Sequence, residues 1–262
     1  MNILLPIIVL GVLGLLFGIG LAFASKKFEV QIDPRLEKIQ GLLPGVNCGA
    51  CGQAGCAGFA EALLEGKVLA DGCKVADDKA RESIAGLLGQ KIEKKVKKTA
   101  CLRCNGGSKV KDRFIYKGIE DCAAANLQLG GQKQCLEGCL GFGTCVKACP
   151  FSAIKMSKEG LPVVDPHKCK ACNKCVLVCP KKLFSLVPVN NKVIVACALH
   201  EPGKETKAVC PVGCIACKIC EKTCKYDAIH VIDYLAVIDH NKCTSCGECV
   251  KACPAKTIRF RG

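Results

Sequence analysis

The sequence predicts an α+β protein built from small metal-stabilised modules behind an N-terminal transmembrane helix. The chain of 262 residues contains 25 cysteines, and most of them stand in tight C-x2-C and C-x3-C spacings. It has no Trp and only 3 Tyr, so its aromatic core is sparse. Its first segment is a long uncharged apolar run. Bound metal can supply folding free energy that a small core lacks, because a metal site does not exist in the unfolded chain.

The N-terminal segment, residues 1–25, is predicted to be a membrane anchor. Ile3 to Ser25 contains no charged residue. A helix of this length, rising about 1.5 Å per residue, crosses a hydrocarbon core of about 30 Å. Lys26 and Lys27 follow at once, so the positive-inside rule places the rest of the chain in the cytoplasm. We therefore expect a single-pass protein of the inner (cytoplasmic) membrane whose first helix contacts membrane lipid.

Two alternatives would place the chain in an oxidising compartment. A cleaved signal peptide is one, because Ala22-Phe23-Ala24 resembles a cleavage site. It is disfavoured because no Lys or Arg precedes the run, which also exceeds the usual core of about 7–15 residues. A disulfide scaffold is the other, but disulfide frameworks spread their cysteines to close loops. The tight spacings here suit thiolates that converge on one metal centre.

The basic charge of the chain is interpreted as counter-charge for bound metal. Lys and Arg number 38 against 23 Asp and Glu, which gives a formal charge of +15 with neutral cysteines. An oxidised 4Fe–4S core held by four thiolates carries roughly −2, so about six clusters would bring the loaded protein to about +3. Nucleic acid is therefore not an expected partner. Some lysine-rich surface remains for an acidic partner such as ferredoxin.

Residues 26–90 are predicted to form a linker and a 4Fe–4S domain. Asp33-Pro34 is a plausible helix start, and a second helix is expected over 57–66. Glycines among the cysteines of NCGACGQAGC let the backbone wrap a cluster closely. Zinc is a poor match, because a zinc ribbon needs two separated C-x2-C pairs. A helix over 76–98, ending in a solvated lysine-rich face, should follow. The expected ligands are Cys48, Cys51, Cys56 and Cys73.

The strongest motif is C-x2-C-x2-C-x3-C-P, which occurs twice. It is the bacterial ferredoxin ligand run, whose fourth cysteine ligates the other cluster of a two-cluster fold. Each run therefore needs a partner upstream. In the second ferredoxin block, residues 213–262, the partner run has Lys225 in place of the usual proline. The expected clusters of this block are Cys214/Cys217/Cys220/Cys253 and Cys224/Cys243/Cys246/Cys249.

The first ferredoxin block, residues 135–190, has a stretched partner run. Its spacing is C-x3-C-x5-C-x3-C-P. Between the half-motifs of both blocks, a short β-hairpin is expected, at Ala153-Ile154 with LPVVDP and at Ala228-Ile229 with LAVIDH. The expected clusters of the first block are Cys135/Cys139/Cys145/Cys179 and Cys149/Cys169/Cys172/Cys175.

Five cysteines remain, and four of them could close a sixth cluster. They lie in a connecting segment, residues 91–134, and in an inter-block loop, residues 191–212. Cys104 sits in CNGG, Cys122 follows the strand-like RFIYKG, and Cys197 and Cys210 flank the loop EPGKE. We assign these four as ligands. Cys101 is the spare, and its exchange with Cys104 stays open.

No catalytic or nucleotide site is apparent on the chain. No G-x-G-x-x-G follows a strand, and no G-x4-G-K-[S/T] occurs. The four histidines are scattered along the sequence and are interpreted as surface or structural residues. The chain is therefore expected to carry no flavin or NAD and to pass electrons without catalysing a reaction of its own.

The order of modules resembles the B subunit family of the Rnf complex, a membrane ferredoxin:NAD oxidoreductase. The resemblance runs from the apolar helix through DPRLEKIQGLLPGVNCGACGQAGCAGFAEAL to GCLGFGTCVKACPF and GCIACKICEKTC. It implies an electron-relay subunit of a translocase that moves Na⁺ or H⁺. Reduced ferredoxin would deliver electrons to its clusters, and other membrane and flavin-bearing Rnf subunits would receive them.

Two other functions fit parts of the sequence. A membrane-tethered polyferredoxin could serve another redox complex, such as a hydrogenase. A zinc-ribbon interaction module is a more remote possibility, and a colourless zinc-loaded protein after anaerobic purification would identify it.

Overall fold

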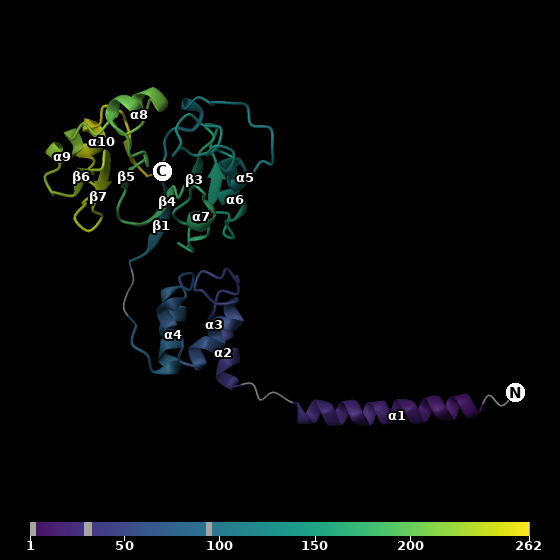
Figure 1. The fold of residues 1–262 in the computed structure, drawn as a ribbon. Coiled ribbons are helices and arrows are strands. Elements are labelled where there is room, and N and C mark those ends of the chain that lie inside the picture. The colour runs from purple at the N-terminus through teal and green to yellow at the C-terminus, as the bar shows by residue number, and fades with distance from the viewer. Residues whose placement is uncertain (1–3, 29–32, 93–95, 262) are drawn as a thin grey trace.

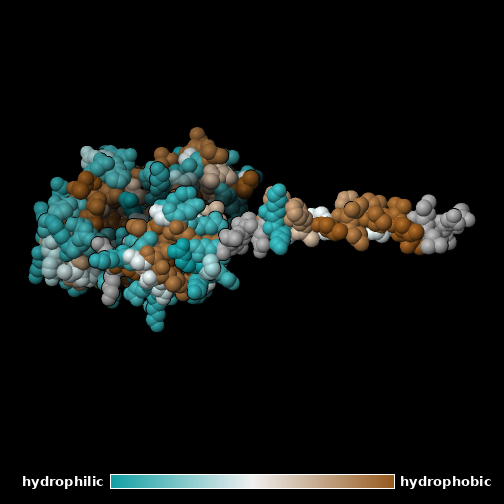
Figure 2. Space-filling model, turned by 90° about the horizontal axis from the view of Figure 1, so that it is seen from below, coloured by the Kyte–Doolittle hydropathy of each residue, from teal (hydrophilic) through white to brown (hydrophobic). Residues whose placement is uncertain are grey.

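The computed structural model describes residues 4–28, 33–92 and 96–261. The helix α1 (Leu4–Lys27) spans 24 residues and ends in Lys26 and Lys27. Its segment from Ile7 to Lys27 is long and apolar enough to cross a membrane, and none of that segment is buried in the protein. Figure 2 shows it as a hydrophobic rod that becomes hydrophilic at one end. The predicted N-terminal apolar helix is confirmed.

The N-terminal module (residues 33–92) packs three helices around a small core. They are α2 (Pro34–Leu42), α3 (Cys56–Leu64) and α4 (Asp78–Leu88), with the 3₁₀ turn η1 (Ala70–Gly72) between the last two. Ile39, Phe59 and Ile84 fill its centre and are almost fully buried. The Asp33 carboxylate accepts the Arg35 N–H at 2.8 Å and caps α2, so the predicted helix start is confirmed.

The helix expected over 76–98 is shorter than predicted. It ends at Leu88 because Gly89 adopts φ 65°, the left-handed conformation that stops a helix. The lysine-rich run that follows belongs to no helix in its described residues, and Lys98 opens a strand. Residues 93–95 of that run lie outside the described residues.

Two further units contain the remaining cysteines, and each holds two antiparallel strand pairs (Figure 1). Block 1 (residues 98–188) pairs β1 (Lys98–Leu102) with β4 (Phe184–Pro188) and β2 (Ile154–Met156) with β3 (Pro162–Val164). Block 2 (residues 193–261) pairs β5 (Val193–Val195) with β8 (Ile258–Phe260) and β6 (Ile229–Ile232) with β7 (Leu235–Ile238).

The strand pairs confirm some expectations and change others. Both predicted hairpins form, as β2–β3 and β6–β7. The strands β1 and β5 were not predicted, and they lie in the segments expected to be connectors. The stretch RFIYKG is no strand, since the only bridge near it joins Asp112 and Lys133 among the described residues. The loop EPGKE instead leads into the helix α8 (Gly203–Val209).

Four short helices carry the central ligand-type cysteines. They are α6 (Thr144–Lys147), α7 (Lys174–Val178), α9 (Ile219–Thr223) and α10 (Glu248–Ala252). Each has a cysteine as its second residue. Each also follows a residue with positive φ, which turns the chain sharply into the helix: Gly143, Asn173, Lys218 and Gly247. Block 1 further contains η2 (Gly107–Lys109) and α5 (Cys122–Leu127).

Candidate iron–sulfur sites

The cysteines gather in six groups of four, and only Cys101 stands apart. All 25 are free thiols. Five of the groups line a cavity each, and the members of the sixth are grouped because Gly106 lies near two of their sulfurs and because three of them raise the pKa of the fourth. We number the groups by their order in space, starting from the N-terminal module.

Set 1 occupies the N-terminal module. The α3 helix begins at Cys56, whose N–H donates to the Asn47 side-chain oxygen at 2.8 Å. Gly55 precedes it with φ 109°, and a Cβ there would come within 2.8 Å of that same oxygen. The tight turn therefore requires glycine, and it places a thiol at the start of the helix. The cavity of this set is lined by Cys48, Cys51, Cys56 and Cys73.

Three sets follow the grouping expected from the ligand swap. In each, three thiols come from one C-x2-C-x2-C loop and the fourth from the end of the opposite helix. Set 2 is Cys149, Cys169, Cys172 and Cys175. Set 5 is Cys214, Cys217, Cys220 and Cys253. Set 6 is Cys224, Cys243, Cys246 and Cys249.

Set 3 differs from the expectation, because Cys122 takes the place predicted for Cys135. The cavity is lined by Cys122, Cys139, Cys145 and Cys179. Asp121 caps α5 and also accepts the Thr144 hydroxyl at 2.7 Å, and the Cys122 N–H donates to that hydroxyl at 2.8 Å. This local network fixes the start of α5 beside the start of α6. The structure does not place Cys135 in the lining of this cavity with Cys139, Cys145 and Cys179, as the sequence had predicted.

Set 4 lies between the two blocks. A Cβ built on Gly106 would lie 3.7 Å from the Cys104 sulfur and 3.8 Å from the Cys210 sulfur, so these thiols face a common space. Burial first, and then three nearby thiols, raise the pKa of Cys135 to about 12; the three are Cys210, Cys104 and Cys197. The structure thus brings together three members of the predicted sixth group, Cys104, Cys197 and Cys210, and places Cys135 beside them instead of Cys122.

The two halves of set 4 are equivalent in the internal repeat. Cys104 closely follows β1, and Cys197 closely follows β5. The N–H of Cys139 donates to the Cys104 sulfur at 3.5 Å, and the N–H of Cys214 donates to the Cys197 sulfur at 3.5 Å. The other thiol of each half begins a C-x3-C pair, Cys135 in block 1 and Cys210 in block 2. The second cysteine of that pair is the N–H donor just named. Each block thus contributes the same two positions.

This equivalence is the signal that could have corrected the grouping. C-x3-C at 135–139 matches C-x3-C at 210–214, so Cys135 corresponds to Cys210. The second cysteine of the loop, Cys217 in block 2, has no counterpart at the matching position of block 1, which is Phe142. Cys122 supplies the missing thiol from an insertion. The sequence around Cys122 contains no local motif that predicts its place in set 3.

Cys101 belongs to none of the six sets. It lies on β1 opposite Ser185 and is buried with Val187 and Ile194. Its sulfur accepts a long contact from the Arg261 guanidinium at 3.9 Å. The structure thus places the Cys104 thiol with set 4 and the Cys101 thiol in a separate apolar cluster, which supports the prediction of Cys104 as the ligand.

The buried thiols of the sets are hard to ionise by themselves. Burial, followed by neighbouring thiols, raises the pKa to about 12 for Cys139, Cys145, Cys175 and Cys220. For Cys249 the pKa is raised to about 11 by the same causes. Four thiolates crowded in such a place require a positive centre among them, which an iron–sulfur core provides.

Three family models match parts of the chain. A model described as a putative Fe–S cluster matches residues 43–75. A 4Fe–4S dicluster domain matches residues 133–184, and a 4Fe–4S binding domain matches residues 236–259. The first match contains all of set 1, and the other two contain most of sets 2, 3 and 6.

Curated relatives match nearly the whole chain. The B subunit of the Na⁺-translocating ferredoxin:NAD⁺ oxidoreductase complex of Acetobacterium woodii is 45% identical over 98% of this chain and 77% of its own length. The B subunit of the ion-translocating oxidoreductase complex of Methanosarcina acetivorans is 43% identical over 97% of both chains. The chain belongs to this B subunit family. A further B subunit, from the proton-translocating ferredoxin:NAD⁺ oxidoreductase complex of Clostridium ljungdahlii, is 40% identical over 98% of this chain and 92% of its own.

The predicted resemblance is thus confirmed, and the chain carries several Fe–S domains behind one apolar helix. The family models leave parts of the sets uncovered. Those cysteines are Cys104, Cys122, Cys197, Cys210, Cys214, Cys217, Cys220 and Cys224. Set 4 and the first half of block 2 therefore depend on the structure of this chain rather than on a domain match.

The thiols of the six sets fit a multi-iron cluster better than a single ion. A zinc ion draws each thiolate to about 2.3 Å. In the described parts of the chain, no group of three or more His, Cys, Asp or Glu side chains is placed to hold one metal ion. The sulfurs instead surround cavities, with apolar side chains completing the walls. This arrangement suits a cubane whose four corners each take one thiolate.

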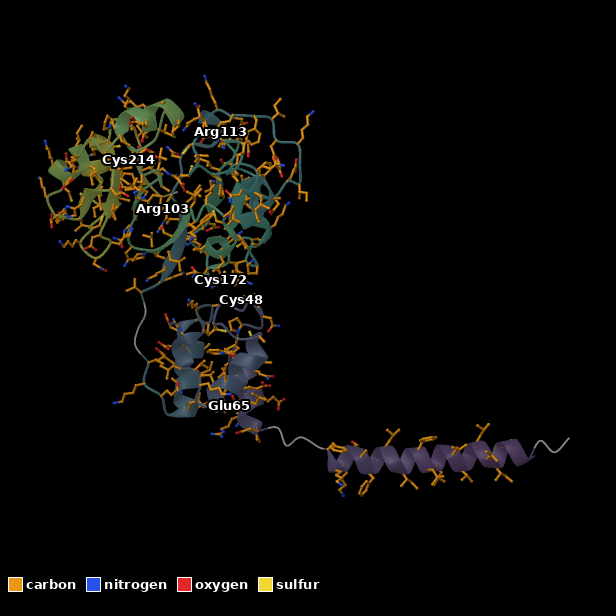
Figure 3. The ribbon with its side chains drawn as sticks, viewed as in Figure 1. Cys48, Glu65, Arg103, Arg113, Cys172 and Cys214 are labelled. Carbon is orange, nitrogen blue, oxygen red and sulfur yellow. The ribbon has the colours of Figure 1, made fainter. Side chains whose placement is uncertain are left out.

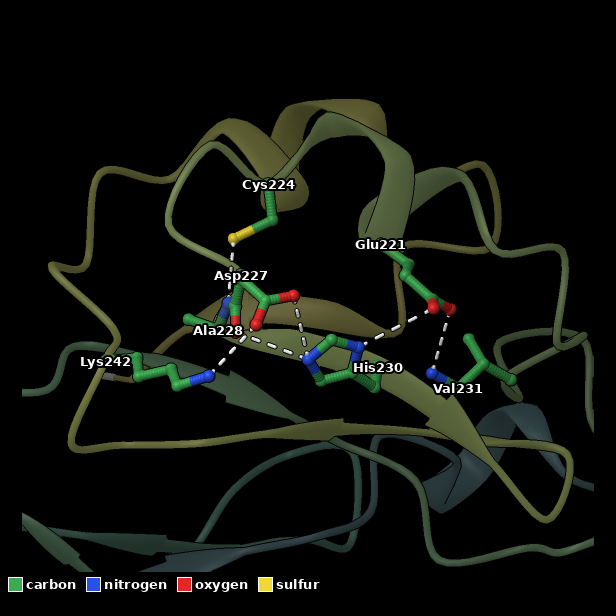
Figure 4. Close-up of polar contacts among 7 residues, drawn as sticks. All are labelled: Glu221, Cys224, Asp227, Ala228, His230, Val231 and Lys242. Atoms are coloured by element: carbon green, nitrogen blue, oxygen red, sulfur yellow. Dashed lines mark hydrogen bonds and ion pairs between the residues drawn. The ribbon is translucent and has the colours of Figure 1, made fainter.

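Backbone N–H groups and paired charges surround the sulfurs. Ala100, Leu183 and Ala228 donate N–H groups to sulfurs of sets 2, 3 and 6, at 3.4–3.5 Å. Such contacts tune the reduction potential of a cluster. Figure 4 shows the last of them, beside an ion pair of Lys242 with Asp227 at 2.9 Å.

Proposed function

We propose that this chain is the electron relay of an Rnf-type ferredoxin:NAD oxidoreductase, with one 4Fe–4S cluster in each of its six sets. Electrons would arrive from reduced ferredoxin and leave toward flavin-bearing membrane subunits, coupled to translocation of Na⁺ or H⁺. The observation that carries this proposal is the convergence of 24 thiols in six quartets on a chain that belongs to the B subunit family. The tandem arrangement of two ferredoxin-type blocks and the exact cluster number are part of the proposal.

We arrange the six sets in one row, and the order follows from which residues of neighbouring sets lie near or influence one another. Cys172 of set 2 belongs to the buried cluster of the N-terminal module, and the Cys48 thiol of set 1 contributes to the raised pKa of Cys172, after burial. Figure 3 shows these two residues next to each other where the module meets block 1. In the same way, the Cys145 thiol of set 3 contributes to the raised pKa of Cys175 in set 2, again after burial.

The second half of the row runs through the boundary between the blocks. Set 3 meets set 4 where the Cys139 N–H donates to the Cys104 sulfur, and set 4 meets set 5 where the Cys214 N–H donates to the Cys197 sulfur. Sets 5 and 6 share the packed helices α9 and α10 of block 2. The proposed relay therefore runs from set 6 or set 5 in block 2 to set 1 in the N-terminal module.

A direction follows from the position of α1. Set 1 lies nearest to the membrane helix in sequence, so we propose it as the point where electrons leave for the membrane subunits. Block 2, at the other end of the row, would receive them from ferredoxin. Lys26 and Lys27 at the end of α1 favour a cytoplasmic location of all six sets. Iron–sulfur clusters supply one-electron storage when bound, while the chain spaces the sets, excludes water and donates N–H groups to sulfur.

The test removes set 1 from the intact complex. Replacing Cys51 and Cys73 by Ala should abolish NAD reduction while reduced ferredoxin still reduces the remaining clusters in a rapid-mixing experiment. Cys101→Ala is the matched control, because this buried cysteine lies outside all six sets, and it should keep both activities. Full NAD reduction without set 1 would show that electrons leave elsewhere. An anaerobic preparation that contains no iron and sulfide would refute the relay itself.

A further inference from the structure

Two thiols of the six sets reach the surface, and both lie in block 2. Among the 25 cysteines, all of which the structure describes, only Cys217 and Cys246 are exposed. They belong to sets 5 and 6, so each marks a mouth where a bound cluster would come close to solvent. An electron carrier in solution must dock at such a mouth, because electron tunnelling requires close approach. The two mouths differ in charge.

The mouth at Cys217 is basic. Lys218 follows it directly and lines the set 5 cavity, and Lys256 lies between Ala255 and Thr257, which line the same cavity. Both lysines are exposed. Within the described residues, neither ammonium has a carboxylate at ion-pair distance. Ile215 and Pro254 complete the rim with apolar surface.

The charges at the mouth of Cys246 are mostly paired, and Lys225, between Cys224 and Tyr226 of its lining, is the one exposed lysine there for which the described residues offer no carboxylate at ion-pair distance. Glu248 and Tyr226 line its cavity, and Lys251 forms an ion pair with Glu248 at 3.1 Å. Farther out, Lys242 pairs with Asp227 at 2.9 Å, as Figure 4 shows. Opposite charges so close together cancel at longer range, so this mouth attracts a charged protein less than the mouth at Cys217.

Lys218 stands where the fold favours another residue. Its φ of 59° lies in the left-handed region, which is unfavourable for a side chain with a Cβ. The equivalent turns before α6, α7 and α10 use Gly143, Asn173 and Gly247, residue types that adopt this conformation most readily. A lysine at this position costs backbone energy without gaining an internal partner.

We propose that the basic mouth formed by Cys217, Lys218 and Lys256 is the docking face for an acidic one-electron carrier protein. The proposal rests on the relay function proposed above and adds the surface, its charge and the set that is reduced first. On docking, the reduced carrier loses one electron and the cluster in set 5 gains it, and no bond or proton changes. A small apolar rim with separate lysines fits a transient encounter, which buries little area and depends on charge.

The test measures binding and electron transfer with the full chain in its complex. The probe is an acidic two-cluster ferredoxin, oxidised for binding and reduced for rapid mixing. The double variant Lys218→Glu/Lys256→Glu should raise the Kd at low salt by about tenfold or more and flatten its dependence on salt. The matched control is Lys225→Glu, the same charge change on an exposed lysine between Cys224 and Tyr226 of the set 6 cavity. It should change the Kd less than about twofold.

A second variant separates docking from folding. Lys218→Gly removes the charge but relieves the left-handed backbone, so it should keep or raise thermal stability and still weaken binding by about threefold. Cluster reduction by dithionite, which needs no protein docking, should be unchanged in every variant. If Lys225→Glu raised the Kd for ferredoxin as much as the double variant or more, the proposed docking face would be refuted. A wild-type protein that dithionite reduces but ferredoxin does not would instead refute the proposed function.

Discussion

The membership of set 3 can be decided by counting iron in a chain that lacks the rest of the set. Replacing Cys139, Cys145 and Cys179 by Ala removes three of its four thiols, so the cluster is lost and iron falls from about 24 to about 20 per chain. In this background, adding Cys122→Ala should change nothing, because its thiol already has no cluster to hold. Adding Cys135→Ala should remove iron again, up to about four per chain, because that thiol belongs to set 4.

The grouping expected from sequence alone gives the opposite result, which makes the experiment decisive. If Cys135 shared a cluster with Cys139, its replacement would be silent and Cys122→Ala would cost iron. The assay is anaerobic determination of iron and sulfide per chain, with electron paramagnetic resonance of the reduced protein to follow the clusters that remain. Unchanged helical circular dichroism and retained spectra of sets 5 and 6 would show that block 2 still folds.

Three further predictions concern residues around the sets. Cys101→Ala should keep about 24 iron atoms per chain and lower the free energy of unfolding by only about 1 kcal/mol, measured by denaturant titration, because it leaves a small cavity on β1. Phe151 packs against the cores of both the N-terminal module and block 1, so Phe151→Ala should slow electron passage from set 2 to set 1 in rapid mixing at unchanged iron content; unchanged kinetics would contradict the contact. Burial lowers the pKa of His240 below its unfolded value of about 6.5, so His240 stabilises block 2 above that pH, and this contribution is lost as the pH falls below it. The melting temperature of His240→Gln should therefore vary less between about pH 7 and pH 5 than that of the wild type.

The regular ligand runs were predictable because their chemistry is local. Sets 1, 2, 5 and 6 group in the structure as the spacings indicate, since each takes three thiols from one short loop, C-x2-C-x4-C in set 1 and C-x2-C-x2-C in the others. The fourth thiol follows from the ligand swap of the two-cluster fold. The hairpins between half-motifs were also visible, because their β-branched residues stand next to those runs.

The parts that failed depend on contacts between distant segments. Cys122 reaches set 3 through the network of Asp121 with Thr144, which joins residues far apart in the sequence. The strands β1 and β5 pair with strands at the other end of their blocks, and neither shows a pattern long enough to identify it. The extent of the helix α4 was overestimated because the polar run after Gly89 resembles a helix face. Comparing the two blocks position by position would have corrected Cys135, but not Cys122.

The position of set 4 also constrains the order in which the protein can mature. Two of its thiols come from each block, so a cluster could not be completed there until the segments that carry Cys197 and Cys210 lie against block 1. The other five sets each draw on a single unit and can be loaded earlier. We therefore expect the cluster proposed for set 4 to form only after the two blocks have docked, and before that step the proposed relay would be interrupted between set 3 and set 5.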